Sequence, residues 1–347
     1  MSYFARILVP IVATLATADL AAAEQSQEDL LKQRMAFWEA QAPHCKVGNF
    51  DSPTKATTDP NQPCDDGDMT MFNGLLCYAG DERGCQAVID AQDPKSGQWF
   101  RSPRIRLLGH NDRGDASFSP DMALGVQLYL VKKGDVDRAI KWATWLNGLV
   151  YKNFAPWGVN WFNRLTNHNI AWFCLEQYGC VVRPGDAAAL GLTFDYLHDK
   201  KGMPVLPDGS IRGTAASWVK WEGVFMWLSS NNKPGYSQHL HAVDILLRRL
   251  ISGDDNAYKK EAEDLAAKPE NKGNAFFAWL AGKDRAEVIR QTLERCPAPD
   301  KLPTPPLFQW QWERDNHVDP GQLPAWQQSC YWDCIFMAKL LKVQSPT

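Results

Sequence analysis

The chain has 347 residues, of which 45% are hydrophobic and 22% charged, a composition typical of folded globular proteins. Its 37 Lys and Arg nearly balance its 40 Asp and Glu, and the net charge of −3 argues against nucleic-acid binding, which usually needs a basic excess. The unusual features are 15 Trp and nine Cys.

The N-terminus has the three-part pattern of a secretory signal. Arg6 supplies a positive charge, residues 7–15 form a short apolar stretch, and Ala21-Ala22-Ala23 resembles a cleavage site. The apolar stretch is shorter than the roughly 20 residues that a membrane span requires. We therefore predict a signal peptide over residues 1–23 and an exported mature chain over residues 24–347, in the periplasm or secreted. An ordinary N-terminal helix is the alternative.

Apolar residues recur at helical spacing along most of the chain. The predicted helices span residues 28–42, 68–79, 85–91, 121–131, 135–150, 168–177, 186–198, 218–228, 237–251, 256–267, 274–280, 284–295 and 325–341. Strand signal is confined to one possible small hairpin around Asp208-Gly209. The Pro-rich stretch over residues 297–324 contains several aromatic residues, so we expect a long loop that packs back onto a single domain.

Two consecutive predicted helices differ in kind. The helix over residues 121–131 is apolar nearly all round and should be enclosed, whereas the helix over residues 135–150 is amphipathic and should lie outside. This alternation resembles the (α/α)6 toroid, or six-hairpin fold, of glycoside hydrolases and polysaccharide lyases. The resemblance implies an all-α fold of antiparallel helical hairpins and a carbohydrate substrate. A plain helical bundle and a superhelical array are the alternatives, but no fixed-period repeat is present.

Many cysteines in an exported chain indicate disulfide bonds. Short-range pairs are the favoured candidates: Cys45 with Cys64, Cys77 with Cys85, and Cys174 with Cys180. Cys296 can pair with either Cys330 or Cys334, which leaves one thiol over. A zinc site is the competing interpretation, but no C-x-x-C and no paired Cys/His spacing occurs.

Two polar loops run directly into predicted enclosed helices, one over residues 64–74 and one over residues 109–123. In a toroid such helix starts meet at one cleft, where two carboxylates can serve as the acid and base of glycosidic hydrolysis. We assign these roles to Asp68 and Asp121, with Asp115 as the substitute for either and Asp66 orienting the pair. Stabilisation by the helix dipole explains an Asp at a helix start equally well.

A third segment, over residues 157–172, places Asn167 and His168 close to an Arg and a Trp. It resembles the machinery of uronate-polysaccharide lyases built on the same toroid, in which Asn and His neutralise the uronate carboxylate. The second hypothesis is therefore a lyase acting by β-elimination. The third is a periplasmic protein that binds glycans or proteins without catalysis.

Substrate binding is assigned to His168, Asn167, Asp66 and Arg104 together with four loop tryptophans, because flat aromatic faces suit stacking on sugars. These tryptophans are Trp157, Trp161, Trp310 and Trp312. Packing within the loops is the alternative for each of them. No nucleotide-binding motif, nucleophile elbow or H-E-x-x-H is present, so no cofactor or metal is expected. The expected partner is a polysaccharide or oligosaccharide, with no nucleic acid and no membrane span.

Overall fold

The computed structural model describes residues 27–55, 64–109, 118, 120–148, 184–204, 232–303, 310–313 and 324–343. Most of these residues are helical. After a helix over residues 27–41 come β1 (His44–Val47), β2 (Phe50–Pro53), α2 (Met69–Tyr78), α3 (Glu82–Asp90), α4 (Pro103–Leu108), α5 (Pro120–Lys133), α6 (Val136–Gly148), α9 (Pro184–Lys201), α12 (Tyr236–Ser252), α13 (Lys259–Ala267), η2 (Pro269–Asn271), α14 (Ala275–Leu280), α15 (Arg285–Arg295), η3 (Gln311–Glu313), α16 (Ala325–Gln328) and α17 (Trp332–Leu340).

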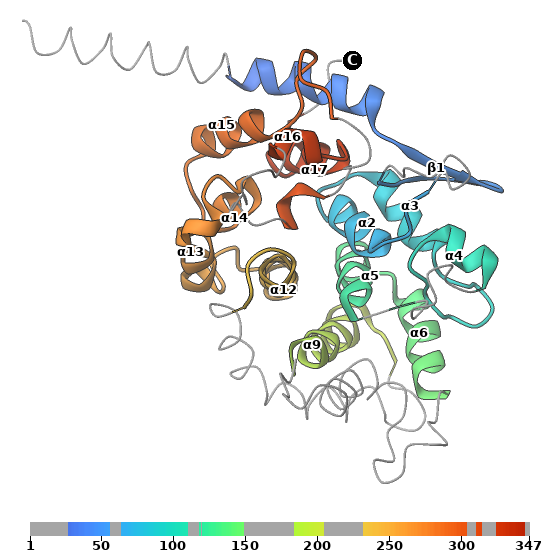
Figure 1. Ribbon diagram of the computed structural model, residues 1–347. Helices are drawn as coiled ribbons and strands as arrows, with labels where there is room; N and C mark the ends of the chain where they lie inside the picture. Colours follow the sequence, from blue (N-terminus) through green and yellow to red (C-terminus); the bar gives the residue numbers. More distant parts are fainter. Residues whose placement is uncertain are drawn as a thin grey trace, which may run out of the picture.

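The helices form an inner and an outer set. In Figure 1, α2, α5 and α12 lie towards the middle, α3, α4, α13 and α15 lie outside them, and α9 and α6 lie below α5. Contacts connect α2 to α5, α5 to α9, and α9 to α12. The predicted difference between α5 and α6 is confirmed, because residues 122–131 are all buried whereas α6 has exposed positions such as Asp137. The described part of the chain is thus mostly helical and shares one apolar core.

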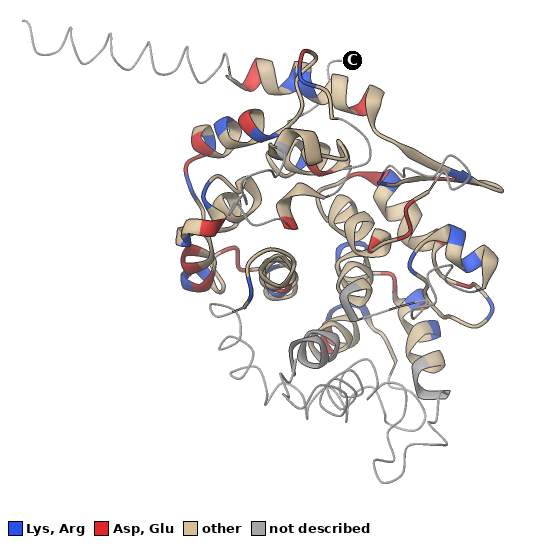
Figure 2. Ribbon diagram, in the orientation of Figure 1, with Lys and Arg blue, Asp and Glu red and all other residues tan. Residues whose placement is uncertain are grey.

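Charged residues are unevenly distributed among the helices. Figure 2 shows Lys, Arg, Asp and Glu gathered on α13, α15 and the helix over residues 27–41, whereas α2 carries none of them. The core cluster includes residues from Leu31 near the start of the described chain to Val343 near its end. Elements from both ends of the chain therefore share it. No helix among the described residues is long and apolar enough to cross a membrane.

The structure differs from the sequence-based expectations in two elements. The one two-stranded sheet in the described chain is the antiparallel pair β1–β2, in which Val47 pairs with Phe50 across a Gly48-Asn49 turn. The hairpin expected around Asp208-Gly209 lies outside the described residues. The helix expected over residues 325–341 is wrong as a single element, because Tyr331 at φ 64° separates α16 from α17.

Three disulfides hold the described chain. The predicted pairs Cys45–Cys64 and Cys77–Cys85 are confirmed, and Cys296 pairs with Cys334. Cys330 remains a buried free thiol. The predicted pair Cys174–Cys180 lies outside the described residues. Disulfides of this kind are compatible with a protein that folds in an oxidising compartment.

Candidate functional site

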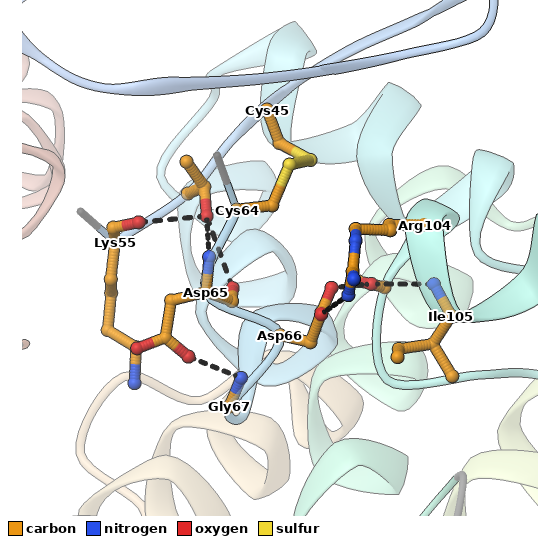
Figure 3. A network of polar contacts seen from close by, with 10 residues as sticks. Cys45, Lys55, Cys64, Asp65, Asp66, Gly67, Arg104 and Ile105 are labelled. Carbon is orange, nitrogen blue, oxygen red and sulfur yellow. Dashed lines mark hydrogen bonds and ion pairs between the residues drawn. A yellow bond between two sulfur atoms is a disulfide. The ribbon is translucent and has the colours of Figure 1, made fainter. Parts of the chain in front are cut away.

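The acidic turn, defined here as residues 64–68, is tethered to the chain that follows β2. The Cys45–Cys64 disulfide fixes its first residue. The Thr54 hydroxyl accepts the Asp65 N–H at 3.1 Å and lies 3.1 Å from the Asp65 carbonyl oxygen. An antiparallel bridge joins Lys55 to Asp65 (Figure 3). The turn is thus held by a covalent bond and local hydrogen bonds immediately before α2 begins.

Asp68 ends this turn and precedes the first residue of α2. Its backbone is left-handed, with φ 60° and ψ 17°, and its side chain makes no capping hydrogen bond. Arg101 Nη1 lies 3.2 Å from Asp68 Oδ1, and the Asp68 side chain is 28% exposed. A left-handed conformation costs free energy for a residue other than glycine, and such strain gathers at functional sites. Asp68 is therefore a partly accessible carboxylate held in a strained, well-defined position.

Asp66 points to the opposite side of the turn from Asp65, towards α4 (Figure 3). Its carboxylate accepts a hydrogen bond from the Ser102 hydroxyl at 2.5 Å and forms an ion pair with Arg104. Burial raises the pKa of Asp66, and the contacts with Ser102 and Arg104 oppose that rise. The side chains of Asp66 and Arg104 are only 6% and 15% exposed. This buried pair locks the acidic turn against the start of α4.

The variant Arg104→Met tests whether Arg104 stabilises the acidic turn or binds substrate. Removing the guanidinium leaves a buried Asp66 carboxylate without its cation, which should lower the free energy of unfolding by about 3 kcal/mol. The double variant with Asp66→Asn should recover part of that loss, because it leaves no unpaired charge. Urea denaturation of both single variants and the double variant gives the coupling. Normal stability with lost glycan binding would instead return Arg104 to the substrate-binding role predicted from sequence.

The helix that follows the second polar loop packs directly on α2. A Cβ at Gly125 of α5 would lie 2.3 Å from the Thr70 carbonyl oxygen, and one at Gly74 would lie 2.3 Å from the Gly125 Cα. The two backbones therefore touch. Asp121 is the second residue of α5, four residues before this contact, and Asp68 precedes Thr70 by two residues. The two predicted catalytic positions thus belong to the beginnings of two adjoining helices; the Asp121 side chain and Asp115 lie outside the described set.

The first turns of several helices meet at one aromatic cluster. Phe72 of α2 stacks on Trp310 with ring centroids 4.7 Å apart, and its ring centroid is 6.4 Å from that of His239 in α12. Phe276 of α14 approaches both His239 and Phe336 of α17. Because Phe72, His239 and Phe276 all lie near their helix starts, these starts converge on one end of the core. The acidic turn leads directly into this end.

His239 is a core residue of this cluster. It is fully buried, and neither ring nitrogen has a hydrogen-bond partner; the Trp312 backbone lies near the ring without normal hydrogen-bond geometry. Burial lowers the pKa of His239 to about 3, so the imidazole is neutral at ordinary pH. Within the described ranges, no group of three or more His, Cys, Asp or Glu is arranged to hold a metal ion.

Trp310 and Trp312 correct the sequence-based assignment. Both are 1% exposed, and the Trp312 indole N–H donates to the Asp333 carbonyl oxygen at 2.7 Å. They pack the Pro-rich loop onto the body, as expected for that loop, and present no face to a sugar. Burying the large apolar ring of a Trp stabilises the fold more than leaving it exposed does. A loop has no regular period, so the sequence does not show which of its tryptophans are buried. Asn167, His168, Trp157 and Trp161 lie outside the described residues.

Asp333 of α17 is expected to make the free energy of unfolding depend on pH. Burial raises its pKa to about 6, against hydrogen bonds from Ser329, Gln311 and Cys334. The folded pKa exceeds the unfolded value of about 3.9, so the contribution is fully present below pH 4 and is lost as pH rises through 6. Wild type should lose up to about 3 kcal/mol of unfolding free energy over this range relative to Asp333→Asn. Urea denaturation at four pH values measures it; parallel wild-type and variant curves would contradict it.

A shallow groove of about 590 Å³ lies elsewhere, on the outer side of α3 and the end of α5. Its charged groups already have partners: Lys133 bonds to Glu82, and the Tyr129 hydroxyl donates to Asp135. It is not part of the acidic turn. We therefore place the candidate site at the acidic turn and the adjoining helix starts. Comparisons of the chain with models of protein families, with curated proteins and with solved structures find no match.

Proposed function

We propose that the protein is an exported glycoside hydrolase with an (α/α)6-toroid fold that cleaves a polysaccharide with two carboxylates, Asp68 and Asp121. The observation that carries the proposal is the direct backbone contact between α2 and α5, because Asp68 immediately precedes α2 and Asp121 is the second residue of α5. The inner and outer helices and the convergence of helix starts on one end of the core support the toroid.

In the proposed reaction one carboxylic acid donates its proton to the glycosidic oxygen as the bond from that oxygen to the anomeric carbon breaks. The other carboxylate takes a proton from the water that attacks the anomeric carbon, and a new reducing end is released. Asp68 is suited to such work because it is partly exposed and oriented by Arg101. Asp66 positions the acidic turn and does not itself react. Its carboxylate is engaged by Ser102 and Arg104 on the side of the turn away from Asp65.

The test is digestion of neutral and uronate-containing polysaccharides by the mature protein. Hydrolysis predicts new reducing ends without the ultraviolet absorbance of an unsaturated uronide. Appearance of that absorbance would replace hydrolysis by β-elimination centred on Asn167 and His168. Binding to a glycan without any product would replace both by a non-catalytic binding protein.

A further inference from the structure

Within the described ranges, one lysine beside the acidic turn has no carboxylate within ion-pair distance. Lys55 follows β2, is only 8% exposed, and is bridged through its backbone to Asp65. Its ammonium lies 5.2 Å from the centre of the Phe72 ring. In Figure 3 its side chain runs along the same side of the turn as that of Asp65, away from the Asp66–Arg104 pair. The position of the amino group is thus set by the same contacts that set the turn.

Among the described residues no carboxylate lies within ion-pair distance of the Lys55 amino group, and no hydrogen bond to it is present. Asp65 Oδ1 instead accepts the Gly67 N–H at 2.7 Å. Although most of the Lys55 side chain is buried, its amino nitrogen is not among the fully enclosed unpaired polar atoms of the described chain, so the ammonium is reachable from solvent. Its contact with the face of one phenyl ring compensates the positive charge less fully than an anion would. A cation so placed favours the arrival of an anion.

The surroundings of Lys55 strengthen this preference. Phe72 lies in the first turn of α2, and its N–H donates to the Asp68 carbonyl oxygen at 3.1 Å. Lys55 also lies near Cys330, just before α17 begins. Helix starts carry partial positive charge. The neighbouring His239 is neutral, so it adds no positive charge that would repel an anion bound at the lysine.

We infer that Lys55 binds an anionic substituent, a carboxylate or a sulfate ester, on the sugar chain that the acidic turn acts upon. The substrate is then an acidic polysaccharide and not a neutral glucan. This inference rests on the proposed function and adds to it the substrate class. Lys55 acts as a specificity-determining residue: its charge pairs with the substituent while Asp68, one helical turn from Phe72, faces the bond to be cleaved.

The experiment compares three polymers: a uronate polysaccharide, the same polymer with its carboxyl groups reduced to alcohols, and a sulfated neutral polysaccharide. Wild type should prefer one of the two acidic polymers to the reduced one. Lys55→Met keeps the aliphatic stem over Phe72 but removes the charge, and should raise KM for the acidic polymer about 10- to 100-fold, with kcat changed much less. Lys55→Arg should keep most of the preference. Lys46→Met, at a lysine 76% exposed on the neighbouring hairpin, is the matched control and should behave as wild type.

The outcomes separate this inference from the proposed function. Two results would overturn the role of Lys55 and leave the proposed hydrolysis unaffected. One is that wild type cleaves the reduced polymer as readily as the acidic polymers. The other is that Lys55→Met raises KM equally for the acidic and the reduced polymers. If the wild type cleaves no polymer, the proposed function fails. Calorimetric binding of uronate oligosaccharides then decides the subsite: a 10-fold or greater loss of affinity in folded Lys55→Met supports it, and unchanged affinity or no binding overturns it.

Discussion

Replacing Asp68 with asparagine is expected to lower kcat on the polysaccharide substrate by about 10³-fold or more, because the reaction loses one of its two carboxylates. Asparagine is isosteric with aspartate and tolerates the left-handed backbone better than other residues do. The Arg101 pair is partly exposed, so its loss should lower the free energy of unfolding by less than about 1 kcal/mol. This variant should therefore lose most of its catalytic rate while its free energy of unfolding changes little.

Asp121→Asn should behave in the same way, and Asp115→Asn decides between the two positions in the second loop. Reducing-end release gives the rate, and urea denaturation gives the stability. Asp264→Asn is the control, because Asp264 lies on α13 in an ion pair with the exposed Lys260, and this variant should leave the rate unchanged. A rate within about threefold of wild type in Asp68→Asn would remove this residue from the site.

The second large effect is expected at the contact between α2 and α5. Gly125→Ala would place a Cβ 2.3 Å from the Thr70 carbonyl oxygen and 2.5 Å from the Met71 Cα, so the helices must separate. We expect a loss of about 3 kcal/mol or more in the free energy of unfolding, because both neighbours are backbone atoms that cannot move aside. Alanine at an ordinary helix position would stabilise the helix by about 1 kcal/mol relative to glycine. The sign of the change is therefore diagnostic.

Denaturant unfolding and thermal unfolding measure this loss. Glu263→Ala in the exposed α13 is a control and should change stability by less than about 0.5 kcal/mol. Gly74→Ala should resemble Gly125→Ala, since its Cβ would lie 2.3 Å from the Gly125 Cα. A Gly125→Ala variant that is as stable as wild type would show that the backbones do not touch, and would weaken the argument that brings Asp68 and Asp121 together.

Helical periodicity predicted most described helices because enclosed and amphipathic helices leave different patterns in the sequence. α2 and α5 are apolar nearly all round and begin within one residue of the predicted positions. The β1–β2 hairpin was not predicted, although Gly48-Asn49 is a turn signal. Gly48 adopts a left-handed φ of 58°, which explains why glycine suits this turn. The break before α17 has no Gly or Pro to announce it: the Ser329 hydroxyl accepts the Tyr331 N–H at 3.0 Å and donates to Asp333.

The candidate site was predictable only in part. The acidic loop and its carboxylates could be predicted because they precede an apolar helix. The partners of these carboxylates could not, because Arg101 and Arg104 are distant in the chain from Asp68 and Asp66. The role of Lys55 also depends on contacts that the sequence does not show. Nothing in its sequence neighbourhood distinguishes it from an exposed lysine such as Lys46; only tertiary packing against Phe72 does.

The Cys45–Cys64 bridge ties the segment that carries Lys55 to the segment that carries the three aspartates, and it spans 19 residues. Opening this bridge would loosen the contact between the segment that carries Lys55 and the acidic turn, while the helices would keep their own apolar packing. Replacing both Cys45 and Cys64 with alanine isolates this bridge from the other two disulfides, Cys77–Cys85 and Cys296–Cys334. On the proposed function, that double variant should lose activity at a denaturant concentration where its helices remain folded.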